Sequence, residues 1–507
     1  MDNSMLSKVF FSDYFGVDRA AINAYGAIDI SLVNDTPLFI DPFLIFESDK
    51  DEYKALHNGI VDYLHFLQAR QFSGSSGEFS RLLHFGEVKQ TWLGYSLSGN
   101  AGQGLGRKFA DALSKRIHLI VPSDDCSDSM IETGVHLEKL CLLDKGIGND
   151  KVSDFTANLI KLFLAEYTSQ FAVEHIDPQL LREVPVEKAV FDYETKRWKP
   201  KKILLPYHAE TRDYVLLTPR DILTKNDLWI NNTAFYEEFC DLPSRVSNEQ
   251  LREEINAYLQ SLIPRGGGGN KKPTKGELYD IYGRVALKYP ILIDAFIASR
   301  EENGERATEQ SAQEVDSVEQ VFSYGARDTI SQLGKDTLFF ATPRLSNSFD
   351  EAMDKVGILK YQIENNDLYR VFYHNGEVII NENGLQRFFK LIWAASRSAF
   401  DINPETNHGK GPVDFAVSFG AADKTLIEFK MASNRQLESN LANQLSVYAR
   451  ADVASREVTQ LTVIFFFTER EYNRATAILH KLKLDQSENI VLIDARADNK
   501  PSGSKVK

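Results

Sequence analysis

The sequence predicts a mixed α/β protein with more than one domain. Its 507 residues exceed what a single hydrophobic core normally serves. Apolar residues make up 43% of the chain and charged residues 26%, which is the balance of a folded protein. Segments with the helical spacing of apolar residues alternate with short apolar runs that are typical of strands. We therefore expect several mixed units rather than one helical or one β domain.

The first 262 residues are expected to form the larger unit, a mixed α/β region. "YKALHNGIVDYLHFLQARQ" at 53–71 and "SDFTANLIKLFLAEYTSQF" at 153–171 have the spacing of amphipathic helices. "KRIHLIVP" at 115–122 and "DYVLLTP" at 213–219 are expected to be short strands. We expect this region to serve recognition, regulation or assembly. Assembly would involve a homo-oligomer or a protein partner.

Residues 263–320 are expected to be a linker and helical connector. "IPRGGGGNKKPTKGE" starts at 263, and its run of glycines beside prolines breaks any regular element. "EENGERATEQSAQEVDSVEQ" at 301–320 is highly charged and is expected to be a solvated connector or an exposed helix. The main domain boundary is placed here, so that 321–497 form a second domain and 498–507 a disordered tail.

The second domain has a recognisable order of elements, which predicts a mixed sheet covered by helices. A hairpin is expected around His374-Asn375-Gly376. It is followed by a helix at 383–398, a strand pair within "GPVDFAVSFGAADKTLIEFK" (411–430) with its turn at 420–424, a helix at 434–451, a fully apolar strand at 461–468, a helix at 470–484 and a strand at 489–496.

Charge and targeting features restrict the classes of protein. The net charge is −14, and residues 401–507 carry 14 basic and 14 acidic side chains, so the negative excess lies upstream. A nucleic-acid contact surface would therefore be local. The longest apolar run, "LTVIFFF", is far shorter than the roughly 20 residues of a membrane helix, and no secretion signal is visible. We expect a cytoplasmic protein without membrane contact.

Three charged residues stand in the apolar strand pair. Glu428 and Lys430 are two residues apart on one strand, so they project from the same face. The turn near 421–423 is expected to bring Asp414 opposite residues 429 and 430. Burying such charges costs several kcal/mol unless something compensates them. Two carboxylates would bind a hard cation such as Mg²⁺, and a lysine beside them would serve a water or a phosphate.

These residues resemble the core motif of the PD-(D/E)XK nuclease superfamily. In that motif an Asp on one strand and an acidic-x-Lys on the next bind the metal and activate water. "PVDF" supplies Asp414, and "IEFK" supplies Glu428, Phe429 and Lys430. The first part has a valine between proline and aspartate instead of adjacent residues.

The following helix extends the resemblance. Gln444 and Tyr448 match the QxxxY element of the RecB-like branch, and Asn440 shares their face. The resemblance covers 370–497. It implies a restriction-endonuclease-like αβ sandwich with a central mixed sheet, in which Gln444 is catalytic and Tyr448 and Asn440 contact substrate.

The resemblance also implies the roles of the strand residues. Asp414 and Glu428, with the backbone carbonyl of Phe429, would ligate Mg²⁺, for which Mn²⁺ would substitute, and Lys430 would serve the attacking water. The superfamily often carries a further acidic residue on the helix before the first motif strand. Glu382 is the nearby candidate, and we do not expect it to take part.

The sequence analysis thus predicts a metal-dependent endonuclease that cuts nucleic acid, with DNA as the first choice. Upstream segments resemble large bacterial proteins that end in such a domain, which favours prokaryotic defence against foreign DNA. Four alternatives remain: a non-catalytic protein of the same fold that binds nucleic acid or a partner, a nuclease that cuts RNA, an N-terminal enzyme of another kind with the C-terminal domain as scaffold, and a structural ion pair in an unrelated α/β domain.

Overall fold

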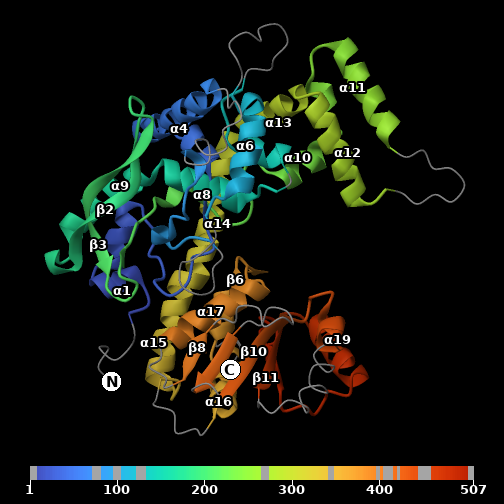
Figure 1. The fold of residues 1–507 in the computed structure, drawn as a ribbon. Helices are drawn as coiled ribbons and strands as arrows, with labels where there is room; N and C mark the ends of the chain where they lie inside the picture. Colours follow the sequence, from blue (N-terminus) through green and yellow to red (C-terminus); the bar gives the residue numbers. More distant parts are fainter. Residues whose placement is uncertain are drawn as a thin grey trace, which may run out of the picture.

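The structure is a computed structural model, and the predicted mixed α/β class is confirmed. It describes residues 8–70, 82–94, 104–121, 133–144, 146–263, 273–340, 347–395, 400–403, 415–419, 423–442 and 458–500. Figure 1 shows a larger part, built from the N-terminal half, above a smaller part that holds a sheet. Within the described residues, no helix is both long and apolar enough to cross a membrane.

The larger part consists of helices around short strands and one long hairpin. Its elements are α1 (Phe11–Phe15), α2 (Arg19–Tyr25), β1 (Phe39–Ile40), α3 (Pro42–Glu47), α4 (Asp51–Ala69), α6 (Arg107–Ile120), α7 (Lys139–Leu143), α8 (Asn149–Leu159), α9 (Lys161–His175), β2 (Leu181–Asp192), β3 (Arg197–His208), β4 (Asp213–Tyr214), β5 (Leu223–Thr224), α10 (Asn232–Glu238), α11 (Glu249–Leu262), α12 (Lys275–Lys288) and α13 (Ile291–Glu301). The predicted helix at 53–71 is confirmed as α4, and the one at 153–171 is divided into α8 and α9.

The two predicted short strands in this part were largely wrong. Residues 115–122 belong mainly to α6, whose buried Phe109, Leu113 and Ile117 follow a helical repeat that starts upstream of the apolar run. In "DYVLLTP" only Asp213–Tyr214 pair as a strand. The backbone N–H groups of Leu216 and Leu217 donate instead to different loops and helices, so this run is buried without joining a ladder.

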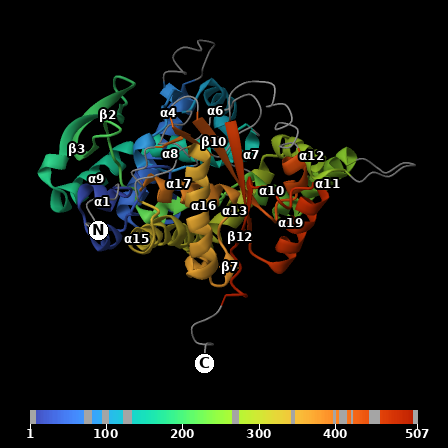
Figure 2. The ribbon, with the colours of Figure 1, turned by 90° about the horizontal axis from the view of Figure 1, so that it is seen from below.

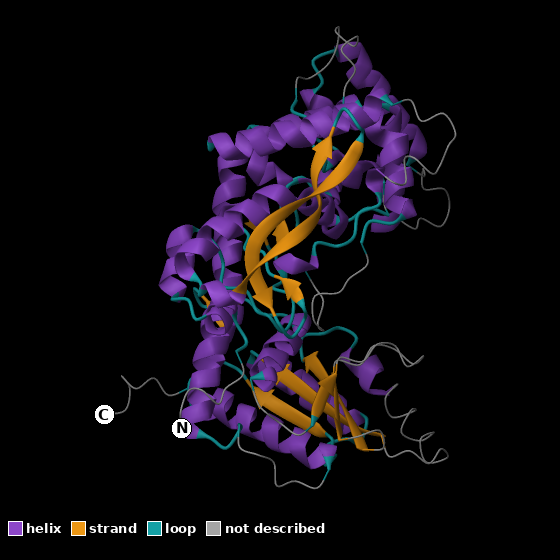
Figure 3. Ribbon diagram, turned by 60° about the vertical axis from the view of Figure 1, so that its left-hand side comes forward, coloured by secondary structure: helices purple, strands orange, loops and turns teal. Residues whose placement is uncertain are grey.

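The long hairpin of β2 and β3 is the main sheet of this part. Figure 3 shows it as a twisted ribbon of strands. The two strands pair antiparallel from Leu181↔Pro206 to Asp192↔Arg197, with a bulge between Val186 and Val190. Such a bulge increases the local twist of the ribbon.

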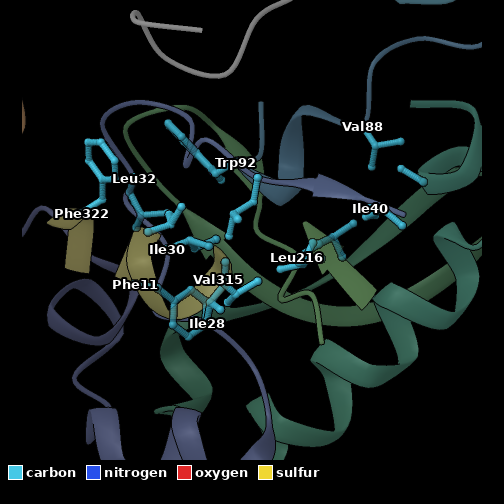
Figure 4. Close-up of a cluster of buried hydrophobic side chains, with 14 of the residues drawn as sticks. Phe11, Ile28, Ile30, Leu32, Ile40, Val88, Trp92, Leu216, Val315 and Phe322 are labelled. Atoms are coloured by element: carbon cyan, nitrogen blue, oxygen red, sulfur yellow. The ribbon is translucent and has the colours of Figure 1, made fainter. Parts of the chain in front are cut away.

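The charged segment at 301–320 is a helix that joins the two parts. It forms α14 (Gly304–Glu319), which continues through one π-helical turn (Gln320–Gly325) into α15 (Ala326–Asp336). Ala307, Val315 and Val318 are buried along one face. Figure 4 places Val315 and Phe322 in the cluster with Phe11, Ile28 and Ile30. The low apolar content of this segment did not predict a buried helix face. A few apolar residues at helical spacing are enough to form one.

The smaller part contains the predicted mixed sheet. Its strands lie in the order β12-β11-β10-β9-β8, where β10 is parallel to β11 and β11 to β12, while β9 is antiparallel to both of its neighbours. Figure 2 shows α16 and α17 on one side of these strands and α19 on the other. The elements are α16 (Ser348–Asn365), β6 (Tyr373–His374), β7 (Glu377–Val378), α17 (Glu382–Ala394), β8 (Asp401–Asn403), β9 (Phe415–Phe419), β10 (Asp423–Met431), β11 (Val458–Phe466), α19 (Glu469–Lys481) and β12 (Ile490–Asp494).

Two local predictions in the smaller part have different outcomes. The hairpin at His374-Asn375-Gly376 is confirmed, with φ of 50° at Asn375 and 81° at Gly376, the positive values that a type I′ turn requires. The predicted register of the strand pair was wrong by at least one residue. Phe415 pairs with Ile427, whereas a turn that set Asp414 opposite 429 or 430 would pair Phe415 with residue 428 or 429.

A buried ion pair ties α15 to the N-terminal segment. Asp29 is 1% exposed, and its Oδ2 lies 2.7 Å from Arg327 Nη2. Asp29 also accepts hydrogen bonds from the backbone N–H and the hydroxyl of Ser12. Each oxygen of this buried carboxylate therefore accepts a hydrogen bond, and among these donors Arg327 is the one that carries a positive charge.

Replacing Arg327 by Met is expected to lower the free energy of unfolding by about 3 kcal/mol, because it strands the charge of Asp29 in the interior. The double variant Asp29→Asn/Arg327→Met should recover part of this loss. Urea denaturation followed by circular dichroism measures both. The matched control is Arg370→Met, which removes an exposed pair with Asp367 and should cost under about 1 kcal/mol. Equal losses for Arg327 and Arg370 would contradict the prediction.

Candidate functional site

The candidate site lies on one face of β10, the central strand of the mixed sheet. Alternate residues of this strand point to opposite faces. Phe429 is buried, and its ring centroid lies 4.8 Å from that of Phe389 on α17. Glu428 and Lys430 share the other face, beside their parallel partners Thr462 and Ile464 on β11. The predicted common face of Glu428 and Lys430 is therefore confirmed.

Lys430 lies between two carboxylates. Its Nζ is 2.7 Å from Glu428 Oε1 and 3.3 Å from Glu382 Oε1. The side chains are 9% exposed for Lys430, 13% for Glu428 and 24% for Glu382. One cation thus faces two anions in a largely dry setting, where their attraction is stronger than in water.

Glu382, which we did not expect to take part, lies in contact with Lys430, while its role in the reaction stays a prediction. It opens α17 directly after the N-cap Asn381, where a negative charge is stabilised by the helix dipole. Its Oε2 accepts hydrogen bonds from Met431 N and Asn434 Nδ2, both at 3.2 Å. Sequence reasoning missed it because only the packing of α17 against β10 brings the helix start to the end of the strand.

Two further polar residues hold the carboxylates, and sequence reasoning missed both. Gln460 on β11 donates from Nε2 to Glu428 Oε2 at 2.9 Å. Asn434 holds Glu382, and the turn that carries Asn434 is itself fixed by Arg474 of α19. Arg474 donates to the carbonyls of Ala432 and Asn434, each at 2.8 Å. Only the register of the parallel strands and the docking of α19 reveal these contacts.

The structure describes only some of the remaining predicted site residues. Asp414, Gln444 and Tyr448 lie outside the described residues. Asn440 is described, within the helical residues 437–442, and no side-chain hydrogen bond joins it to the Lys430 cluster in this part of the structure. Phe429 supplies a buried ring, while its carbonyl as a metal ligand stays a prediction.

The donor chemistry of the cluster suits a hard cation. Glu382 and Glu428 present carboxylate oxygens, which Mg²⁺ prefers, and both contact Lys430. Across the described ranges, no group of three or more His, Cys, Asp or Glu side chains is arranged to hold a metal. The third carboxylate of the predicted set, Asp414, falls outside these ranges.

A second group of buried acids lies in the larger part and was not predicted. Asp41 is fully buried and accepts hydrogen bonds from Phe43 N at 3.0 Å and Trp229 N at 2.7 Å. Glu138 is 1% exposed, and its Oε1 has no hydrogen-bond partner within the described part of the chain. Burial raises the pKa of Asp41 to about 6 and raises the pKa of Glu138 well above its usual range, to which the charge of Asp41 adds.

The fold and the cluster define a mixed α/β protein with a charged site in its C-terminal sheet. Residues 16–231 match the family described as Domain of unknown function (DUF8370), and residues 348–469 match Domain of unknown function (DUF8371). The second match includes Glu382, Glu428 and Lys430. Neither a curated protein nor a solved structure matches the chain.

The buried acids predict a pH effect on stability. Because the pKa of Asp41 is raised to about 6 in the folded state, from about 4 in an unfolded chain, the folded protein binds the extra proton between these values. Wild type should therefore gain stability relative to Asp41→Asn as the pH falls from 7 to 4. Chemical denaturation at several pH values measures this difference.

Asp62, on the exposed face of α4, provides the control for this comparison. The difference between wild type and Asp62→Asn should show no such gain over the same range, since an exposed carboxyl is not desolvated on folding. A flat difference for Asp41→Asn would contradict the prediction.

Proposed function

We propose that this protein is a metal-dependent nuclease that hydrolyses phosphodiester bonds, with DNA as its substrate. The observation that carries the proposal is the meeting of Glu382, Glu428 and Lys430 at β10, beside the buried apolar residues Ile427 and Phe429. Their order along the chain, an acid on a helix and then an acid-x-lysine strand, agrees with the resemblance to the PD-(D/E)XK superfamily. A role in defence against foreign DNA is part of the same proposal.

The cost of the cluster supports a function for it. Replacing a buried ion pair by apolar side chains of similar volume is often neutral or stabilising, and Ile427 and Phe429 of β10 are apolar and buried. Folding alone does not require Lys430 to be surrounded by two acids. Metal-assisted hydrolysis of a phosphodiester uses anions to hold the metal ion and positive charge to face the phosphate.

Each residue of the cluster has a part in the proposed reaction. Glu382 and Glu428, with Asp414 as implied by the resemblance, would hold Mg²⁺, which when bound neutralises phosphate charge and lowers the pKa of a water. Lys430 would orient the attacking water or stabilise charge on the phosphate. Gln460 and Asn434 would keep the two carboxylates turned toward Lys430, through the hydrogen bonds described above.

Cleavage is expected to need Mg²⁺ or Mn²⁺, because the donors are carboxylate oxygens, and to be weak with Ca²⁺, whose coordination is looser. Incubating the full chain with plasmid, linear DNA and RNA, with each cation or with EDTA, tests this. The same assay decides between DNA and RNA as substrate. Cleavage at full rate in EDTA would rule out the two-carboxylate mechanism.

Replacing Lys430 by Met is expected to lower the cleavage rate at least about 100-fold, since it removes the positive charge next to the reacting phosphate. The matched control is Lys424→Met, the same substitution on the same strand and face, six residues away. The control should cleave at close to the wild-type rate. Circular dichroism confirms that both variants are folded, and equal rates for the two would contradict the role of Lys430.

A further inference from the structure

A basic groove lies next to the candidate site. It has a volume of about 300 Å³ and lies between the segment after β10 and the face of α19 that carries Arg474, Ile478 and Lys481. Its charged lining consists of Arg435, Glu438, Arg474 and Lys481. Arg474 and Lys481 belong to α19, and Arg435 and Glu438 belong to the segment after β10, whose Leu437 packs in one buried cluster with Ile478 of α19.

The groove carries positive charge that its own carboxylate does not cancel. Lys481 Nζ lies 2.5 Å from Glu438 Oε1, so these two charges neutralise each other. Arg435 is exposed and forms no ion pair with any described residue. Among the described residues, Arg474 donates to backbone carbonyls and forms no ion pair. Two guanidinium groups therefore line the groove without a carboxylate partner in the described part of the chain, whose full sequence has a net charge of −14.

The groove is continuous with the candidate site through one short turn. Arg435 directly follows Asn434, whose side chain donates to Glu382. Arg474 lines the groove and also donates to the carbonyl of Asn434. A strand bound at Lys430 and running past this turn would thus pass the two arginines. Guanidinium groups suit phosphate oxygens, because their planar N–H donors match two acceptors at once.

We propose that this groove binds a backbone phosphate of the nucleic-acid strand that enters the candidate site. This inference rests on the proposed function. In it, Arg435 contacts the phosphate, and Arg474 both contacts the phosphate and supports the turn at Asn434. The negative charge of Glu438 weakens the binding of anions in the groove. The contact is independent of base sequence, because phosphates are the same in every strand.

The test measures binding of the full chain to fluorescein-labelled single-stranded and duplex DNA and RNA in EDTA, where cleavage is not expected. Arg435→Ala should weaken binding about three- to tenfold at 0.15 M salt and lower the slope of log affinity against log salt by about one. Glu438→Gln should tighten binding, because it removes a negative charge from the groove. Lys335→Ala on α15, exposed on the far side of the sheet, is the matched control and should bind as wild type.

The outcomes separate this inference from the proposed function. If wild type binds and cleaves, while Arg435→Ala, Glu438→Gln and Lys335→Ala all bind alike, the groove proposal is overturned and the nuclease proposal stands. If wild type neither binds nor cleaves any nucleic acid with Mg²⁺, both fail. Opposite shifts for Arg435→Ala and Glu438→Gln support the groove, since loss of folding cannot tighten binding.

Discussion

The contact between Phe429 and Phe389 determines where the charged cluster forms. These rings lie 4.8 Å apart at 53°, a tilted arrangement that aromatic pairs favour, and both side chains belong to the buried core. The contact holds α17 against the middle of β10. Since Glu382 opens α17 and Lys430 is adjacent to Phe429, the same packing brings the acid to the lysine. An apolar contact on one face of the strand thus sets the polar geometry on the other.

The helix that carries Glu382 is also held by the N-terminal part. Arg387, one to two turns after Glu382, is 2% exposed and donates from Nη1 to the carbonyl of Asp35 at 2.7 Å. Asn34 donates in return to the carbonyl of Arg387 at 3.3 Å. Helix α17 is therefore fixed between β10 and the segment at 34–35. A displacement of that segment would act on the element that places Glu382, so the larger part and the cluster are mechanically connected.

The sequence predicted the features that depend on local residue patterns. It did not predict contacts that are set by packing between segments distant in the chain. The spacing of apolar residues gave α4, the hairpin at Asn375-Gly376, the mixed sheet and the common face of Glu428 and Lys430. It could not place Glu382 or Gln460, because the approach of α17 and the register of β11 are set by contacts across the whole domain. The apolar run at 115–122 was predicted as a strand because it was considered without the residues before it. Those residues begin the helix α6, to which most of the run belongs.

Comparison with the other buried charges strengthens the case that the cluster is functional. Lys139 and Lys355 are 0% and 2% exposed, and each pairs with one carboxylate, Asp294 and Glu351 respectively. Such one-to-one pairs leave no net charge, as expected of a structural ion pair.

Three arginines in the described structure also pair with two carboxylates each, but in each case one of the carboxylates is well exposed. These partners are Asp316 of Arg220 at 57%, Asp13 of Arg327 at 38% and Glu469 of Arg496 at 62%, so water screens their negative charge. Lys430 is 9% exposed, and screening there is weaker. Two carboxylates brought close to each other repel where screening is weak, and a bound cation would offset that repulsion. This is the physical reason to connect the cluster with a metal rather than with the stability of the fold.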